Sequence, residues 1–435
     1  MAAQLESLSG ALAPVAARQQ SLRDHNLSVV LRQVADAAGA VSRADVAGTT
    51  GLTRSTVSSL VETLVEAGLV QEVGPGPRTG AGRPANGLVV SGARVAGLGL
   101  ELNVDYLAAC VLDLSGQVRH REVLPEDQRR TAPARAVSAL AALARRALAA
   151  ADRDGLTVCG AAVALPGLVH APDGLLRLAP NLGWRDVDVI DLLRRDPALR
   201  RRPALAVSVD NEANLAALGE LSMGGTAGGT GATAGGHPQS FLYVSGEIGV
   251  GAGLVLDGRI FRGTHGWGGE IGHLPVHPDG PMCSCGSRGC LEQVAGQEAI
   301  LRRSGLRTVP GTSLAGRPVA ALVSTARRGD RRLLSALDEA GRALGLAVSA
   351  VVNVVDVDTV VLGGLYAELA EWIVPPVADE IARRVLAHAW SPVTVRCSAL
   401  GGDAAVLGAA ASVVRGTVEH PAETLRLLAT ESGRA

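Results

Sequence analysis

One histidine and three cysteines lie close together in the sequence and have the side chains of metal ligands. His273, Cys283, Cys285 and Cys290 fall within eighteen residues, with glycines between them. An imidazole and three thiolates supply the four ligands of a tetrahedral zinc ion, and because all four come from the protein, such a site is structural rather than catalytic. The alternative is that the cysteines are reactive or incidental and that the histidine is unrelated to them.

A second group of polar residues lies on one face of an expected helix near the N-terminus. After Thr53, a possible helix cap, apolar residues recur with a helical period from Val57 to Val65, so one face is buried. A shorter expected helix begins with a capping box at Ser42 and ends at a turn containing Gly51. Two short helices joined by a tight glycine turn are typical of a helix-turn-helix. The residues of the second helix that we expect to contact DNA are Arg54, Ser55, Thr56, Ser58 and Ser59.

A two-stranded hairpin is expected after these helices. Its long tip is rich in glycine and proline and carries Arg83, which could enter a minor groove as the wing of a winged helix-turn-helix. The alternative for this region is a small three-helix bundle whose serine and arginine face is merely solvated. The expected hairpin and the domain that follows it favour a DNA-binding role for this region over the solvated bundle.

From residue 93 onward, strand-like runs alternate with helical ones, which predicts an α/β fold. The expected helices include residues 134–151, 212–221, 333–352 and 403–414, and the expected strands include 158–164, 205–209, 241–245, 359–362 and 393–397. We divide the chain into a flexible arm at 1–20, a winged helix-turn-helix domain at 21–90, an α/β domain at 91–418 with a metal loop at 273–290 and a flexible insertion at 224–236, and a tail at 419–435.

The composition limits the possible functions. With 435 residues, 47% of them hydrophobic, the chain is not a disordered or collagen-like protein. A net charge of −1 argues mildly against nucleic acid, and residues 1–90 are also neutral, with seven arginines and seven acidic residues. Support for DNA binding therefore comes from the local placement of the arginines. The sequence has neither a leader pattern nor a run of about 20 apolar residues, so we expect a cytoplasmic protein without a membrane span.

The segment from Gly269 to Glu292 resembles the signature of the ROK family (repressors, open reading frames and sugar kinases). The resemblance covers nearly the whole chain and includes Ala164-Leu165-Pro166-Gly167, Pro180-Asn181-Leu182-Gly183-Trp184, Val209-Asp210-Asn211-Glu212-Ala213-Asn214 and Val361-Leu362-Gly363-Gly364. It implies an actin-like, two-lobed sugar-kinase domain after the winged helix-turn-helix. It also implies that the hydroxyl groups of a sugar are bound by Asn211, Glu212, Glu270, His273 and Glu292. Carboxylates and an amide suit this role, because vicinal hydroxyls both donate and accept hydrogen bonds.

The chain departs from the family's sugar kinases where those enzymes bind ATP. Their first phosphate-binding turn contains two glycines, whereas this chain has none between Glu101 and Tyr106. The second phosphate-binding segment of those kinases corresponds to residues 245–249 of this chain. Glu247 lies in it, and a negative charge at this position disfavours the binding of phosphate. The catalytic aspartate of the kinases is replaced by Glu212, whose extra methylene displaces the carboxylate by about 1 Å. This pattern most resembles the xylose-repressor branch of the family.

The sequence therefore predicts a sugar sensor that has lost phosphoryl transfer. We expect a homodimer or a dimer of dimers that binds a palindromic, double-stranded operator and responds to a monosaccharide such as xylose or a hexose. Two alternatives remain open. The chain could be an active ATP-dependent sugar kinase with an appended DNA-binding domain, or a DNA-binding protein whose C-terminal domain is only a dimerisation scaffold.

Overall fold

A computed structural model describes residues 19–74, 86–224, 238–306 and 317–432. The chain forms two compact units, one made of residues up to Ser91 together with those from Gly416 onward, and the other of Gly92–Arg415. Nearly all of the expected arm at 1–20 and of the insertion at 224–236 lies outside the described residues, as does Arg83. No helix among the described residues combines the length and the apolar character needed to span a bilayer.

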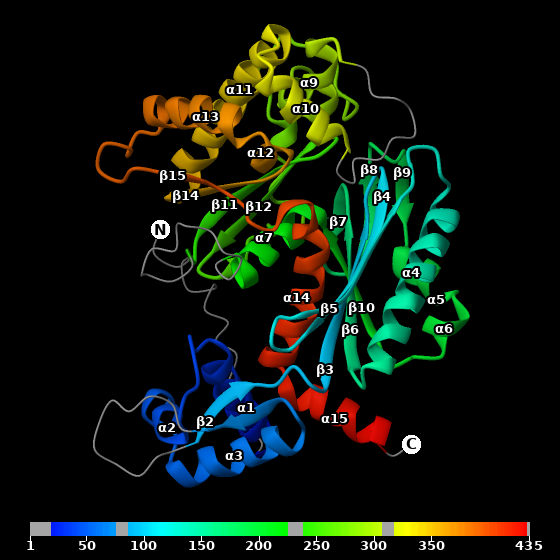
Figure 1. The fold of residues 1–435 in the computed structure, drawn as a ribbon, viewed down its shortest axis with the longest axis vertical. Coiled ribbons are helices and arrows are strands. Elements are labelled where there is room, and N and C mark those ends of the chain that lie inside the picture. The colour runs from blue at the N-terminus through cyan, green and yellow to red at the C-terminus, as the bar shows by residue number, and fades with distance from the viewer. Residues whose placement is uncertain (1–18, 75–85, 225–237, 307–316, 433–435) are drawn as a thin grey trace, which may run out of the picture. The chain divides into compact units, whose positions relative to one another are not determined.

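The first unit begins with three helices and a hairpin, drawn in blue in Figure 1. They are α1 (Gln19–Ala35), α2 (Arg43–Thr50), α3 (Arg54–Glu66), β1 (Val70–Val73) and β2 (Gly87–Val90), the two strands being antiparallel. The expected capping box of α2 is confirmed, because the side chain of Ser42 accepts from the backbone N–H of Asp45 and the Asp45 carboxylate accepts from that of Ser42. The expected apolar stripe of α3 is confirmed by its buried residues, which are Val57, Leu60, Val61 and Leu64.

The C-terminal segment corrects one expectation, since residues 419–435 are not simply a tail. Residues Pro421–Ser432 form helix α15, which packs against α1 in the first unit. Leu428 is buried, and the Arg426 guanidinium donates to the Asp24 carboxylate at 2.9 Å. The buried positions Pro421, Thr424 and Leu428 share one helical face, and a proline suits the first turn of a helix.

The second unit contains two five-stranded sheets with the same strand order. The first runs β10-β6-β3-β4-β5, and the second runs β13-β12-β11-β14-β15. In each, an antiparallel meander (β3-β4-β5 or β11-β12-β13) is extended from its first strand by two parallel strands. The bounds are β3 (Val95–Leu102), β4 (Tyr106–Asp113), β5 (Val118–Pro125), β6 (Thr157–Leu165), β10 (Ala206–Asn211), β11 (Phe241–Gly246), β12 (Val250–Leu256), β13 (Arg259–Ile260), β14 (Thr359–Gly364) and β15 (Thr394–Cys397).

Helices cover these sheets and fill the space between them. Helix α4 (Pro133–Arg153) packs on the first sheet, and α11 (Arg331–Val355) and α13 (Ala370–Arg384) lie side by side on the other lobe (Figure 1). Helices α7 (Glu212–Met223) and α14 (Ala404–Glu419) share a core with residues of both sheets. The remaining elements are α5 (Val189–Arg194), α6 (Pro197–Arg200), α8 (Glu292–Ala295), α9 (Gln297–Ser304), α10 (Arg317–Arg327), α12 (Leu365–Glu368) and a small sheet of β7 (Leu168–His170), β8 (Leu175–Ala179) and β9 (Trp184–Val187).

This architecture confirms the predicted fold class, a winged helix-turn-helix unit and a two-lobed α/β domain. Its topology also has a consequence for function. The parallel strands β3, β6 and β10 end at one edge of the first sheet, and β11 and β14 end at one edge of the second. Ligands of open α/β sheets bind outside the carboxyl ends of such strands.

Candidate functional site

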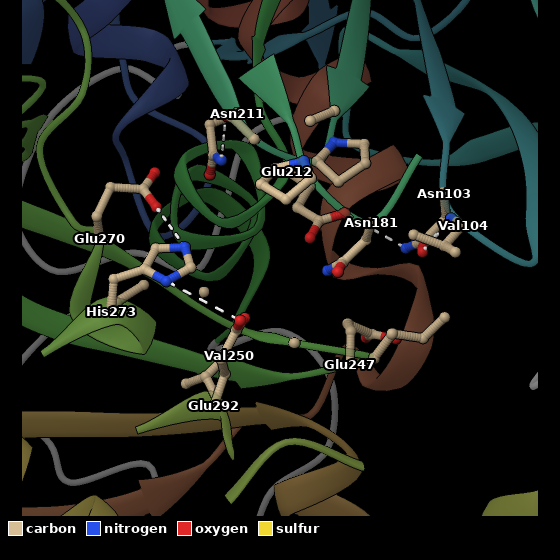
Figure 2. A pocket seen from close by; sticks show the side chains of 18 of the residues that line it. Asn103, Val104, Asn181, Asn211, Glu212, Glu247, Val250, Glu270, His273 and Glu292 are labelled. Carbon is tan, nitrogen blue, oxygen red and sulfur yellow. Dashed lines mark hydrogen bonds and ion pairs between the residues drawn. The ribbon is translucent and has the colours of Figure 1, made fainter. Parts of the chain in front are cut away.

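All five residues that we expected to contact a sugar line one pocket of the second unit. Asn211 ends β10 and Glu212 begins α7, so both come from the first lobe. Glu270 and His273 lie at a short 3-10 turn, and Glu292 begins α8, so these three come from the second lobe. Figure 2 shows Glu270 and His273 on one side of the pocket. A ligand held by all five residues would therefore bridge the two lobes.

The side chain of Asn211 is held from two directions. Its Oδ1 accepts hydrogen bonds from the backbone N–H groups of Ala213 at 2.8 Å and Asn214 at 3.3 Å, which caps helix α7. Its Nδ2 donates to the carbonyl of Gly167 at 2.9 Å. The amide is thus oriented before any ligand binds, and its second N–H remains available as a donor.

His273 lies between the pocket and the cysteine cluster. Its Nδ1 is 3.7 Å from Cys283 Sγ, whereas its Nε2 is 3.9 Å from Glu270 Oε2. A metal on Nδ1 would leave Nε2 protonated and directed toward Glu270, which fixes the tautomer of the ring. Glu292 also adjoins both sites, because its Oε1 lies 2.9 Å from Cys283 Sγ while the residue lines the pocket.

The cysteine cluster brings together the four side chains that could bind a tetrahedral zinc ion. The candidate ligand atoms of His273, Cys283, Cys285 and Cys290 all lie within 4.8 Å of one another. Ligands about 2.3 Å from a tetrahedral zinc are separated by about 3.7 Å, and Cys285 Sγ is 3.7 Å from Cys290 Sγ. Backbone conformation supports the cluster at Gly289, where φ is +63° and a Cβ would lie 1.5 Å from the carbonyl oxygen of His277. These residues fit zinc.

The inner end of the pocket is crowded with carboxyl groups. Glu212 and Glu247 line both the pocket and an adjoining small cavity, which Glu101 also lines. Burial raises the pKa of Glu212 to about 8, with further contributions from the charges of Glu101, Glu270 and Asp105. Burial likewise raises the pKa of Glu101 to about 7 and that of Glu247 well above its ordinary value. At neutral pH this region therefore holds protons rather than a full set of negative charges.

Side chains fill the turn between β3 and β4, where the sequence lacks glycine. Asn103 is buried, and its Nδ2 lies 3.2 Å from Glu101 Oε1 and 3.4 Å from Glu212 Oε2. The Tyr106 hydroxyl donates to the same Glu101 oxygen at 2.5 Å. This turn thus joins the carboxyl cluster by hydrogen bonds.

Three polar pocket residues were not among the expected sugar ligands. Asn103, Asn181 and Glu247 line the pocket together with the expected five, and Figure 2 shows Asn103 and Glu247 across the pocket from Glu270. Asn103 directly follows strand β3 and Glu247 directly follows β11. Their position after strand ends was the signal that could have identified them.

The candidate DNA-contacting residues lie at the start of α3. Arg54, Ser55 and Ser59 are exposed, whereas Thr56 and Ser58 are half-buried. Thr53 caps the helix by accepting from the backbone N–H of Thr56 at 3.2 Å, and its hydroxyl also pairs with those of Ser55 and Thr56. An exposed helix N-terminus with arginine and hydroxyl side chains is suited to contact phosphates and base edges.

Comparison with known proteins agrees with both units. The model of the ROK family matches residues 97–415, and that of the IclR helix-turn-helix domain matches residues 27–74. The xylose repressor of Bacillus subtilis (strain 168) is 28% identical over 379 residues, covering 86% of this chain and 91% of that protein. The glucokinase of Thermotoga maritima is 33% identical over 258 residues, covering 57% of this chain and 77% of that protein.

A solved structure shares the fold of nearly the whole chain. It is a crystal structure of a ROK family transcriptional regulator, a homologue of the E. coli MLC protein, with a TM-score of 0.72 at 23% sequence identity. The likeness covers 94% of this chain and 99% of that one. With the family model matching most of its length, the chain belongs to the ROK family and carries a helix-turn-helix domain of the IclR type at its N-terminal end.

Proposed function

We propose that the protein is a sugar-responsive, DNA-binding transcriptional repressor of carbohydrate-utilisation genes. One observation carries the proposal: the same chain contains a helix-turn-helix and a pocket lined by side chains that suit a sugar. Asn103 and several carboxyl groups lie at the same pocket. The named repressor of Bacillus subtilis supports it, because the similarity covers both units.

The DNA-binding role rests on α3 and the hairpin. In the proposed complex, Arg54, Ser55, Thr56, Ser58 and Ser59 contact the major groove, and Arg83 contacts the minor groove. The hydroxyls of Ser55 and Thr56 both pair with that of Thr53, whose single proton can be donated to only one of them, so that one would be free to donate to DNA while still accepting within the cap. A homodimer, or a dimer of dimers, would present paired helices to the two halves of a palindromic operator.

The sugar-binding role rests on the bridge between the lobes. A monosaccharide such as xylose or a hexose would contact Asn211 and Glu212 from one lobe and Glu270, His273 and Glu292 from the other, which favours a closed arrangement. To release DNA, the sugar must bind the non-operator state more tightly. A nearly complete switch needs a difference of about 5 kcal/mol between the two states.

Zinc has a structural role in this proposal. When bound by His273 Nδ1 and the three cysteines, the ion would hold the 273–290 loop and the imidazole in place while leaving no position open for substrate. The residues on the pocket side, His273 Nε2 and the carboxylate of Glu270, remain available for sugar hydroxyls.

The alternative of an active sugar kinase is less consistent with the site. A general base must be ionised at the operating pH, whereas the pKa of Glu212 is raised to about 8 by burial and neighbouring carboxylates. Glu247, beside it in the pocket, supplies no positive charge or fixed donor for an anionic phosphate group. The protein is therefore proposed to be a non-enzymatic sensor.

The test combines three measurements on the full chain. The purified protein is first used to select its operator from a random DNA library, and anisotropy then follows release by xylose, glucose or N-acetylglucosamine. We expect one sugar to release the operator. Robust ATP-dependent phosphorylation of any of these sugars would instead establish the kinase. If no sugar shifts the melting temperature or the DNA affinity, the C-terminal unit is only a scaffold.

A further inference from the structure

The rings of His170, His265 and Trp267 gather at one place on the second unit, where His265 and Trp267 are exposed and His170 is half-buried. The rings of His170 and His265 have centroids 6.4 Å apart and are stacked, and the ring of Trp267 lies 5.0 Å from that of His265. Trp267 is 40% exposed. Aromatic rings that lie together and are partly open to solvent offer flat faces for a ligand.

The two segments that carry these rings both lead out of the pocket. Gly167 lines the pocket, and β7 follows it directly and ends at His170. Gly269 also lines the pocket, and Trp267 lies two residues before it. Three residues of strand span about 10 Å, the length of one or two sugar rings. The aromatic cluster thus lies beside the pocket rather than inside it.

Backbone contacts join these two segments closely. The N–H of Ala171 donates to the carbonyl of His265 at 3.1 Å. At Gly266, φ is +94° and a Cβ would lie 2.8 Å from the nitrogen of Ala171, so a side chain there would separate the segments. Arg262 ties the same loop to the pocket, because its Nε donates to the carboxylate of Asp210, the neighbour of Asn211, at 2.8 Å.

The chemistry of the cluster suits a carbohydrate. Aromatic faces pack against the apolar C–H face of a sugar ring, and the ring nitrogens of the histidines can bond its hydroxyls. His170 is held in place by Asp173, whose Oδ1 lies 2.9 Å from His170 Nδ1. A protein partner could also use exposed aromatic rings, but continuity with a sugar-type pocket favours a saccharide.

We propose that His170, His265 and Trp267 form an outer sugar subsite, which holds the second ring of an oligosaccharide whose first ring occupies the pocket. This inference rests on the proposed function and specifies its effector as a disaccharide or a longer glycoside. The pocket alone would then bind the corresponding monosaccharide more weakly.

The test measures the affinity of the full-length protein by calorimetry for matched pairs of sugars. The pairs are xylose and xylobiose, glucose and cellobiose, glucose and maltose, and N-acetylglucosamine and chitobiose. We expect at least one disaccharide to bind about tenfold tighter than its monosaccharide. Trp267→Ala should lose most of this gain and leave monosaccharide binding unchanged, while Trp267→Phe should keep part of it. Trp390→Ala is the matched control, since Trp390 is 83% exposed and lies outside the cluster.

Tryptophan fluorescence supplies a second readout. The chain has four tryptophans, and a disaccharide that packs on Trp267 should change their fluorescence emission. This change should be absent in the Trp267→Ala variant and present in the Trp390→Ala variant. If monosaccharides bind as tightly as their disaccharides, or if Trp267→Ala changes no affinity, the outer subsite is refuted while the proposed function stands. If no saccharide of either length binds, the proposed function fails as well.

Discussion

The substitution Glu212→Gln should make the protein more stable at alkaline pH than the natural chain. The carboxyl of Glu212 has an ordinary pKa of 4.5 when unfolded, and burial together with the charges of Glu101, Glu270 and Asp105 raises its pKa to about 8 in the folded protein. Between these two values the unfolded chain has released a proton that the folded protein keeps. Rising pH therefore favours unfolding throughout this window.

The size of this change in the free energy of unfolding follows from the width of the pH range between the two pKa values. Each pH unit in which one state holds one more proton changes the free energy of unfolding by about 1.4 kcal/mol. From pH 4.5 to pH 7.5, Glu212 alone therefore removes up to about 4 kcal/mol. Glutamine keeps the shape and cannot ionise, so Glu212→Gln should recover most of this loss at pH 7.5 and little at pH 4.5.

Urea denaturation between pH 4.5 and pH 8.5 tests this reasoning. The natural protein and Glu212→Gln should have similar free energies of unfolding at the acidic limit and diverge as the pH rises. Glu371→Gln, a substitution of an exposed glutamate on α13, is the control that should follow the natural protein. Parallel curves for the natural protein and Glu212→Gln across the whole range would show that Glu212 ionises normally and would refute the argument.

Three further predictions concern the other parts of the molecule. Thr53→Ala removes the cap of α3 and should lower the free energy of unfolding by about 1 kcal/mol in urea titrations, whereas the exposed Thr49→Ala should not. Cys290→Ala should abolish bound zinc in elemental analysis, whereas Cys397→Ala should retain it, and equal zinc in both would contradict the assigned ligands. Because residues 1–90 carry no net charge, operator affinity should depend on salt with a slope shallower than about −6, and a steeper slope would indicate more phosphate contacts than this unit supplies.

Much of the fold could be predicted because its elements have strong periodic patterns. The expected helices at 134–151 and 333–352 are confirmed as α4 and α11, and the expected strands at 158–164 and 241–245 as β6 and β11. Helix α15 was missed because it is stabilised by contacts with α1, some four hundred residues earlier, which no local pattern reveals. The short strands β7 to β9 were missed for a different reason, because strands of three to five residues carry little periodicity.

The candidate site could be predicted where it depends on residue type and spacing. The histidine and cysteines do lie together, and the five sugar-type residues do line one pocket. What the sequence could not reveal is the environment of each group. Asn103 and Glu212 are 109 positions apart, and only the fold brings the amide within 3.4 Å of the carboxylate. The raised pKa of Glu212 is likewise a result of burial and of carboxylates from other segments.

Three residues at which we expected a departure from the family's kinases are distant in sequence and meet at one place in the structure. The side chain of Asn103, the carboxyl of Glu212 and the carboxyl of Glu247 line the same end of the pocket. Burial and the charges of Glu101, Glu270 and Asp105 keep Glu212 protonated there, and a protonated carboxyl can donate to a sugar hydroxyl but cannot accept its proton. In the proposed sensor, one cluster of side chains would therefore both bind the sugar and disfavour phosphoryl transfer.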